Sequence, residues 1–289
     1  MKTALRFIKE QLQDYYPDAE IKSLGYLMLS AVRNVDKTSV LRDKDKQLSL
    51  NERLRIEEMV EELKQYRPIQ YITGETEFYG LKFKVDENVL IPRPETEELV
   101  EQVLKPPPNP LQKRGNKCRV LDIGTGSGCI AVGLAKHLPQ AEVYALDISS
   151  KALDVARQNA KLNQVEVHFF EHDILKDEPL AFPFASLLFD CIVSNPPYIT
   201  VKEKAAMAKN VLDYEPHQAL FVPDENPLLF YERIADFARS RLKENGALYL
   251  ETNSFYGRAS AKALEEKKYR SVQLIKDISG NDRIIIAKI

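Results

Sequence analysis

The sequence predicts an α/β protein in which a doubly wound, largely parallel sheet follows an N-terminal bundle of helices. Three observations lead to this prediction. Residues 1–67 have apolar side chains at helical spacing. From Cys118 onward, short apolar strands alternate with amphipathic helices, and a glycine-rich turn follows the first strand. We therefore expect a helical domain at 1–67, a linking β-hairpin at 68–92 and the sheet domain at 93–289.

The helical domain has one clear start signal. Ser49-Leu-Asn-Glu52 has the form of a capping box, in which the Ser and Glu side chains satisfy free amide groups at the beginning of a helix. Apolar residues then recur at i, i+3, i+4 and i+7, and they are Ile56, Met59, Val60 and Leu63. This pattern predicts a small bundle with one shared core.

The next segment links the two domains. Residues that favour strands surround Gly74 and Gly80 and predict a hairpin. A helix is expected at Glu95–Leu104, and the proline run at 106–110 interrupts the chain after it, because proline cannot continue a helix. We interpret the basic residues that follow as a solvated loop rather than a phosphate-binding patch. They are Lys113, Arg114, Lys117 and Arg119.

Seven strands are expected in the sheet domain, with helices between most of them, notably at 150–162 and 226–242. The expected strands are 119–123, 142–146, 166–170, 189–194, 247–251, 271–275 and 283–288.

Composition narrows the function classes. The chain has 289 residues and a net charge of −2, so no global positive field favours nucleic acid. No apolar run approaches the roughly 20 residues of a membrane span, and the first ten residues do not resemble a secretory signal. The three cysteines are too scattered for a metal site and fit a reducing compartment. We expect a cytoplasmic protein with no metal and no membrane association.

A glycine loop ends the first strand of the sheet domain. Gly124, Gly126 and Gly128 stand at alternate positions, which argues against a turn without a ligand. A dinucleotide site needs G-x-G-x-x-G, and Cys129 occupies its third glycine position. With Asp122 before it, the loop is instead similar to the D-x-G-x-G-x-G of class I methyltransferases. That similarity implies a Rossmann-like sheet whose loop wraps S-adenosylmethionine.

Two acidic residues follow the next two expected strands. Asp147 can accept the hydroxyl groups of a ribose, although NAD enzymes use the same device and a helix cap is the alternative reading. Asp173 is a candidate for the adenine amino group, and a loop aspartate is its alternative.

The most specific motif is Ser194-Asn-Pro-Pro-Tyr198, directly after the fourth expected strand. Two prolines hold the chain extended and fix the Asn195 side chain and the Pro196 carbonyl as two acceptors on one rigid edge. A planar amide or amino group has two N–H donors to match them, and Tyr198 offers an aromatic surface. This motif predicts methylation of such a nitrogen.

Together these motifs resemble the HemK/PrmC family, the glutamine N5-methyltransferases of peptide chain release factors. Asn-Pro-Pro-Tyr alone also occurs in methyltransferases of adenine or guanine amino groups, so the particular features are the helical front end and the segment Ile91–Glu97. Further matching stretches are Pro68–Tyr71 with Gly74, Glu77–Gly80, Tyr214–Pro216, and Asp277 with Gly280 and Asp282-Arg283.

The resemblance implies a substrate, a cofactor and site residues. The acceptor is the glutamine of the Gly-Gly-Gln tripeptide of release factors, held by the helical domain. Arg93 and Glu95 organise the pocket or the domain junction, or form plain salt bridges. The expected catalytic residues are Asn195, Pro196 and Tyr198, and Pro197 joins them in binding the substrate. The expected S-adenosylmethionine contacts are Asp122, Gly124, Thr125, Gly126, Ser127, Gly128, Asp147, Asp173, Ile174 and Asn195.

Three alternatives stay open at this point. A nucleic-acid amino methyltransferase would need a basic groove, which the net charge does not indicate. A cofactor-binding module without activity is disfavoured by the intact Asn195–Tyr198 motif, and a dehydrogenase is the most distant. We expect a monomer that binds release factors and does not bind nucleic acid directly.

Overall fold

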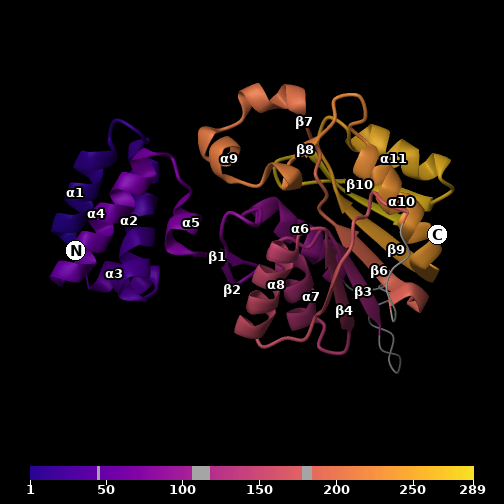
Figure 1. Ribbon diagram of the computed structural model, residues 1–289, viewed down its shortest axis with the longest axis horizontal. Helices are drawn as coiled ribbons and strands as arrows, with labels where there is room; N and C mark the ends of the chain where they lie inside the picture. Colours follow the sequence, from indigo (N-terminus) through magenta and orange to yellow (C-terminus); the bar gives the residue numbers. More distant parts are fainter. Residues whose placement is uncertain (44–45, 106–117, 178–183) are drawn as a thin grey trace. The chain divides into compact units, whose positions relative to one another are not determined.

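The computed structural model describes residues 1–43, 46–105, 118–177 and 184–289 (Figure 1). The proline run at 106–110 and the basic residues Lys113, Arg114 and Lys117 lie outside these ranges. The described chain divides into two compact units. The first is Met1–Glu75 with Ala208–Tyr214, and the second is Thr76–Met207 with Glu215–Ile289.

The first unit is a bundle of helices with its own apolar core (indigo to violet in Figure 1). The capping box predicted at Ser49 is confirmed: Ser49 Oγ accepts from the Glu52 amide at 3.2 Å, and Glu52 Oε2 accepts from the Ser49 amide at 2.6 Å. The fully buried side chains include Ile8, Leu12, Met28, Leu29, Ile56 and Leu63. The helices are α1 (Lys2–Leu12), α2 (Asp18–Arg33), α3 (Lys37–Arg42), α4 (Leu50–Lys64) and α5 (Ile69–Thr73).

A segment distant in sequence completes this unit. Helix α9 (Lys209–Tyr214) belongs to it, which the sequence analysis did not predict. The Tyr214 hydroxyl donates to the Gln65 carbonyl at 2.8 Å, and the Lys209 ammonium group lies 5.1 Å from the centre of the Tyr66 ring.

The hairpin lies within the predicted segment 68–92 but does not include its first residues. Ile69–Thr73 forms the short helix α5, because the Pro68 carbonyl accepts from the amides of Tyr71 and Ile72. Gly74 ends this helix with a φ of +74°, a conformation that costs glycine little. The hairpin itself consists of β1 (Glu75–Phe78) and β2 (Leu81–Lys84).

The second unit is built on a sheet that has seven strands among the described residues, in the order β10-β11-β9-β6-β3-β4-β5. The strands from β9 to β5 in this order are parallel, and β11 is antiparallel to both of its neighbours. The doubly wound fold is thus confirmed. Its strands are β3 (Arg119–Ile123), β4 (Glu142–Asp147), β5 (His168–Glu171), β6 (Phe189–Ser194), β9 (Leu242–Glu251), β10 (Arg270–Lys276) and β11 (Asp282–Lys288).

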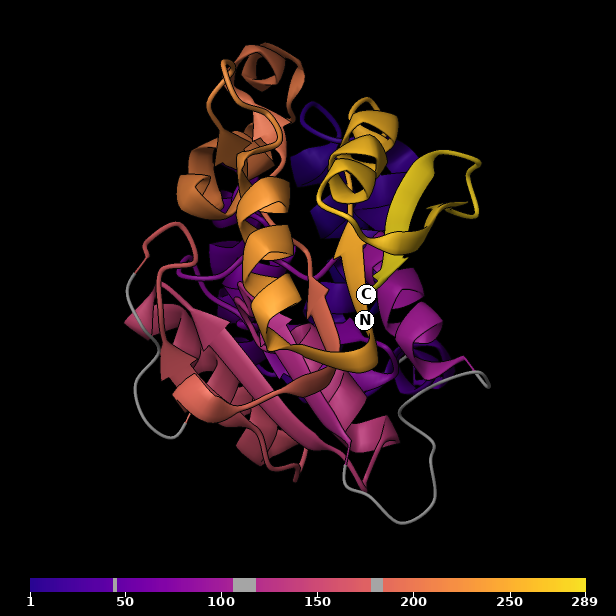
Figure 2. The same cartoon turned by 90° about the vertical axis from the view of Figure 1, so that its right-hand side faces the viewer.

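Helices cover both faces of this sheet. Successive residues of a strand point to opposite faces, so neighbouring apolar residues pack in two different cores. Val120 packs in the core formed with α6 (Pro94–Leu104), α7 (Cys129–His137) and α8 (Ser150–Leu162). Leu121 packs in the opposite core, which contains residues of α10 (Leu229–Arg241) and α11 (Gly257–Glu266). Figures 1 and 2 show the sheet between these two layers. Short elements complete the unit: β7 (Ile199–Thr200), β8 (Phe221–Val222) and 3-10 turns at Phe184–Ser186, Val201–Ala206 and His217–Ala219.

The order of the strands reverses at β3. The chain proceeds from β3 to β4 and β5 on one side, and then returns to place β6 against the other side of β3. In such sheets ligands bind beyond the carboxyl ends of the strands at the reversal point. The residues that follow β3, β4, β6 and β9 therefore share the edge at which a site is expected.

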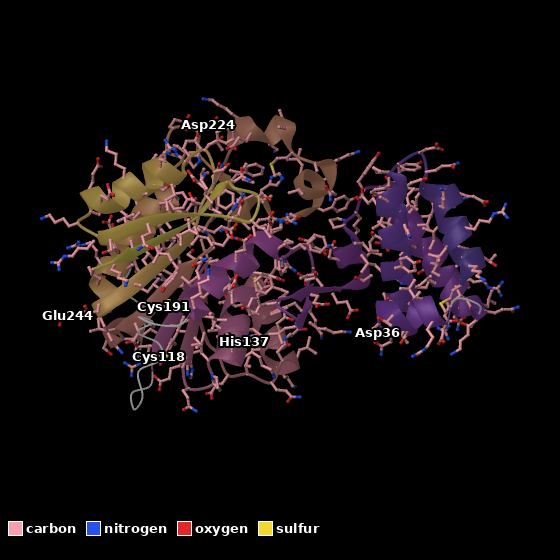
Figure 3. The ribbon with its side chains drawn as sticks, turned by 180° about the vertical axis from the view of Figure 1, so that it is seen from behind. Asp36, Cys118, His137, Cys191, Asp224 and Glu244 are labelled. Carbon is pink, nitrogen blue, oxygen red and sulfur yellow. The ribbon has the colours of Figure 1, made fainter. Side chains whose placement is uncertain are left out.

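The cysteines are buried and do not form disulfides. Cys118 precedes β3, Cys129 begins α7 and Cys191 lies on β6. Figure 3 labels Cys118 and Cys191. Burial raises the pKa of the Cys129 thiol to about 12, so it stays protonated and packs as a small apolar group. In the described parts of the chain, no helix is long and apolar enough to span a bilayer, and no cluster of His, Cys, Asp or Glu could hold a metal ion.

The capping box gives a test of the first unit. Ser49→Ala removes the side chain that accepts the Glu52 amide, and this should destabilise α4 by about 1 kcal/mol. Amide hydrogen exchange in α4 should become about fivefold faster, since about 1 kcal/mol is a factor of roughly 5 in the local equilibrium. Ser49→Thr keeps the acceptor and serves as the control. Unchanged exchange in Ser49→Ala would contradict the assignment.

Candidate active site

The glycine loop folds over the end of the neighbouring strand. Gly124 and Gly126 have φ values of +71° and +54°, which L side chains rarely adopt. The amides of Gly124 and Thr125 both donate to the Leu146 carbonyl, at 2.9 and 3.0 Å. A Cβ added at Gly124 or Gly126 would meet no atom within 4 Å, so one side of the loop is open to a ligand.

Gly128 has a different role. Its φ is +81°, and an added Cβ would lie 3.0 Å from the Ala156 Cβ. The third glycine therefore lets α7 pack closely against α8. Ser127, which precedes it, is buried beside the Cys129 thiol.

Asp122 lies beneath the loop and is fully buried. Its Oδ2 accepts from the Thr125 hydroxyl at 2.6 Å and from the Ala131 amide at 3.2 Å, which links the strand, the loop and α7. Within the described residues its Oδ1 has no partner. Burial raises the pKa of Asp122 to about 7, although these two hydrogen bonds oppose the shift. Asp122 positions the loop, and its predicted contact with a cofactor stays a prediction.

The structure places Asp147 beside the loop. Its Oδ2 accepts from the Gly126 amide at 2.8 Å, and its Oδ1 accepts from the Ser149 amide at 2.9 Å. Burial raises the pKa of Asp147, while these amides lower it. The residue as a whole is half-buried. Asp147 thus supports the turn before α8, and its contact with ribose hydroxyl groups stays a prediction.

The next strand brings Asp173 to the same edge. The His172 amide donates to the Asp147 carbonyl at 3.0 Å, which ties the end of β5 to the end of β4. Asp173 Oδ1 accepts from the Leu175 amide at 2.9 Å, as in a local turn. Ile174 packs partly buried against the core on the α10 side of the sheet.

The Asn195–Tyr198 motif begins where β6 ends. The Ser194 hydroxyl donates to the Ile123 carbonyl at 2.7 Å, which fixes the motif beside the start of the glycine loop. Pro196 is buried, and Asn195, Pro197 and Tyr198 are half-buried. The Tyr198 hydroxyl donates to Glu251 Oε1 at 3.1 Å. Burial raises the pKa of Tyr198 far above its usual value, so the phenol remains neutral at physiological pH.

Two ion pairs explain motifs that the sequence analysis left open. Arg93 Nη2 lies 2.6 Å from Glu215 Oε1, and the Glu215 side chain is only 1% exposed. Burial raises the pKa of Glu215, and Arg93 opposes this. Arg283 pairs with Asp277 at 3.1 Å in the same way. Glu95 is exposed. All four residues belong to stretches that match the family, so the family resemblance could have suggested that they pair.

The sequence analysis missed Thr96 and Glu251 as members of the site. Asn195 Nδ2 donates to Thr96 Oγ1 at 3.1 Å, and Thr96 Oγ1 donates to Glu251 Oε2 at 2.8 Å. Thr96 is in the segment Ile91–Glu97, and Glu251 is the last residue of β9. Their positions in sequence gave no sign that they meet.

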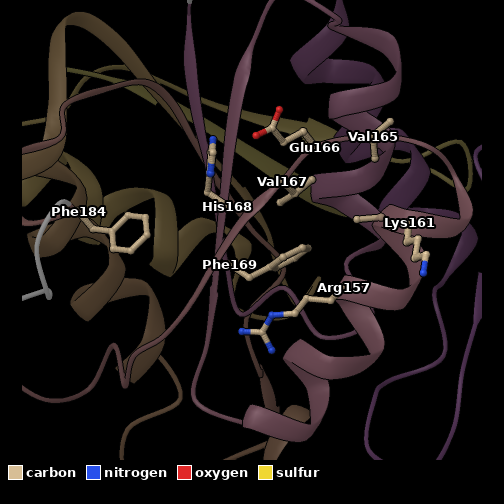
Figure 4. A pocket seen from close by; sticks show the side chains of 9 residues that line it. Arg157, Lys161, Val165, Glu166, Val167, His168, Phe169 and Phe184 are labelled. Atoms are coloured by element: carbon tan, nitrogen blue, oxygen red, sulfur yellow. The ribbon is translucent and has the colours of Figure 1, made fainter.

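A separate hollow of about 480 Å³ lies along β5 (Figure 4). It shares no residue with the predicted site. It is lined by Arg157, Ala160, Lys161, Val165, Glu166, Val167, His168, Phe169 and Phe184.

Asp122 gives a pH-dependent test of the loop. The folded protein binds the Asp122 proton more tightly than the unfolded chain does. The contribution of Asp122 to the free energy of unfolding should therefore fall as pH rises from about 4 to about 7. Asp122→Asn keeps an acceptor for Thr125 and Ala131 and removes this titration. The Tm of this variant minus that of wild type should therefore increase over the same pH range and then level off.

The control for this test is a change at the exposed Gln140, Gln140→Ala, which removes no ionisable group, so its Tm difference from wild type should stay flat with pH. A difference for Asp122→Asn that is constant or falls with pH would show that the buried carboxyl group does not titrate in this range.

Comparisons with known proteins agree with this geometry. Residues 3–74 match the family model of the PrmC N-terminal domain, and residues 108–219 match that of the methyltransferase small domain. Among solved structures, a methyltransferase from Pyrococcus furiosus has the same fold, with a TM-score of 0.51 and 18% identity over 73% of this chain and 90% of that one.

Relatives of known name cover nearly the whole chain. It is 46% identical to a release factor glutamine methyltransferase of Flavobacterium psychrophilum, over 96% of this chain and 94% of that protein. It is 44% identical to the protein of the same name from Bacteroides thetaiotaomicron, over 99% of both. The resemblance drawn from the motifs is thereby confirmed, and the chain belongs to the release factor glutamine methyltransferase family.

Proposed function

We propose that the protein transfers a methyl group from S-adenosylmethionine to the side-chain amide nitrogen of the glutamine in the Gly-Gly-Gln tripeptide of peptide chain release factors. The observation that carries this proposal is the position of Asn195 at the reversal point of the sheet. There the Ser194–Ile123 hydrogen bond holds the amide-binding motif against the glycine loop. The names of the relatives supply the protein substrate.

The loop fits S-adenosylmethionine, which, when bound, supplies an electrophilic methyl group on a sulfonium. The open side of Gly124 and Gly126 accepts a ligand close to the backbone. Asp147 accepts the Gly126 amide, and a carboxylate at this strand end is suited to ribose hydroxyl groups. Asp173 and Ile174 follow on the adjacent strand, where the adenine would lie. Together these residues offer backbone amide, carboxylate and apolar groups for the methionine, ribose and adenine parts of the cofactor.

The acceptor edge orients the substrate nitrogen. Asn195 Oδ1 and the Pro196 carbonyl would accept the two N–H groups of the glutamine amide. An amide nitrogen is a poor nucleophile because its lone pair is delocalised, and it gains positive charge as the methyl group arrives. Fixed acceptors therefore stabilise the transition state more than the ground state. The Tyr198 ring supports the flat amide.

The helical unit holds the release factor, and the protein acts as a cytoplasmic monomer without direct contact to nucleic acid. Three buried free thiols fit a reducing compartment. The net charge of −2 gives no general attraction to nucleic acid.

The decisive measurement locates the methyl group. Purified protein, S-adenosylmethionine and a release factor from the same cell are mixed, and the product is mapped by tandem mass spectrometry. We expect a methyl group on the Gly-Gly-Gln glutamine. Asn195→Ala should lower kcat by about 100-fold or more, because it removes an acceptor aligned with the developing charge. An unmodified glutamine with cofactor binding intact would reject the substrate, and full activity of Asn195→Ala would reject the acceptor edge.

Cofactor binding is tested separately by calorimetry. Asp147→Ala removes the carboxylate that we propose for the ribose, which is also the acceptor of the Gly126 and Ser149 amides. The affinity for S-adenosylmethionine should fall about tenfold or more, the loss expected for a charge-assisted hydrogen bond. The exposed Asp154→Asn is the control. Unchanged affinity in Asp147→Ala would place the cofactor elsewhere.

A further inference from the structure

Two buried residues connect the acceptor motif to a strand on the other side of β6. Thr96 and Glu251 are 2% and 1% exposed. Asn195 Nδ2 donates to Thr96 Oγ1 at 3.1 Å, and Thr96 Oγ1 donates to Glu251 Oε2 at 2.8 Å. Asn195 directly follows β6, Thr96 lies on α6 and Glu251 ends β9, so only the folded chain assembles them.

The direction of these hydrogen bonds sets the orientation of the Asn195 amide. A threonine hydroxyl has one hydrogen, and Thr96 gives it to the carboxylate. Its oxygen is then an acceptor, which favours the Nδ2 of Asn195 and disfavours Oδ1 as its neighbour. The Asn195 Oδ1 must therefore point away from Thr96. No residue in the described ranges donates to it, so it remains available as an acceptor.

The same carboxylate holds the other end of the motif. Tyr198 donates directly to Glu251 Oε1 at 3.1 Å, whereas Glu251 Oε2 reaches Asn195 only through Thr96. Asn253 adds a bond from its side-chain amide to the Tyr198 carbonyl at 3.2 Å. Burial raises the pKa of Glu251, and the hydrogen bond from Thr96, the charge of Arg283 and the hydrogen bond from Tyr198 oppose this in turn.

We propose that Thr96 and Glu251 are positioning residues that fix the Asn195 amide with its oxygen toward the substrate and lock the Tyr198 ring beside it. This inference rests on the proposed function and adds two residues to it that touch neither substrate nor cofactor. An Asn195 free to rotate by half a turn would present N–H groups to the N–H groups of the acceptor amide. Donors would then face donors, and this repulsion would move the substrate nitrogen out of line with the methyl group.

The test compares Thr96→Val with Thr96→Ser. Valine keeps the shape of threonine and cannot bridge Asn195 to Glu251, whereas serine keeps the hydroxyl. We expect kcat of Thr96→Val to fall between about tenfold and about 100-fold, as for misplaced reacting groups. The KM for the release factor and the Kd for S-adenosylmethionine should change by less than about threefold, since the lost interaction acts on alignment rather than on binding. Thr96→Ser should restore most of the rate.

Thr252→Val is the matched control. Thr252 is a fully buried threonine next to Glu251 in sequence, and its hydroxyl bonds to the Asn253 carbonyl at 3.3 Å and to the Tyr231 side chain. The variant Thr252→Val removes a buried hydroxyl from the same region and leaves Asn195, Thr96 and Glu251 unchanged. Its kcat should remain near that of wild type, and its Tm shows how much stability a buried hydroxyl contributes there.

Glu251→Gln gives an independent arm. A glutamine amide has one acceptor oxygen and cannot receive both the Thr96 and the Tyr198 hydroxyls. Its kcat should fall as well. The double variant Thr96→Val with Glu251→Gln should lose little more than the worse single variant, because both interrupt one connected network.

The outcomes are distinct. A wild type that methylates glutamine alongside an equally active Thr96→Val overturns this inference and leaves the proposed function standing. A Thr96→Val protein that loses cofactor affinity, or that loses far more Tm than Thr252→Val, also overturns it, since Thr96 then acts in binding or folding. A wild type that leaves the glutamine unmodified overturns the proposed function and this inference together.

Discussion

The reversal of strand order at β3 is the constraint on which the rest of the structure depends. Because β4 and β6 flank β3 on opposite sides, the loops that follow these strands meet at one edge. The Leu146 carbonyl receives two amides of the glycine loop, and the Ile123 carbonyl receives the Ser194 hydroxyl. Backbone groups at strand ends are thus satisfied by the loops of the site itself, so the register of the sheet determines where the loops lie.

Buried acidic groups are the cost of this arrangement. Asp122 under the glycine loop and Glu251 behind the acceptor motif both lie inside apolar cores, and burial raises the pKa of each. Asp122 is 0% exposed and Glu251 is 1% exposed. Each accepts hydrogen bonds from hydroxyl or amide donors on separate elements. These bonds fix the geometry of the glycine loop and of the acceptor motif, and they offset part of the free-energy cost of burying a carboxyl group. The two acids position the two halves of the site, the loop and the acceptor edge.

The helical unit follows a separate logic. It has its own apolar core and capping signals, and it recruits α9 from the middle of the sheet domain sequence. The chain thus leaves the second unit at Ala208 and re-enters it at Glu215, which pairs with Arg93. A family motif, Tyr214-Glu-Pro216, spans this point, with Tyr214 bonded in one unit and Glu215 in the other.

The sequence by itself determined the elements whose signals are local. Periodicity located all seven strands of the large sheet, the capping box located α4, and glycines and prolines located the loop and the acceptor motif. The residues of Ile69–Thr73 favour a strand, but the segment forms a helix because Pro68 and Gly74 cap it at its two ends. Only the tertiary structure decided that Thr96 joins Asn195 to Glu251, that Arg93 pairs with Glu215 and that α9 belongs to the helical unit. These are contacts between side chains far apart in the chain, and they depend on strand order and register, which no local pattern of residues encodes.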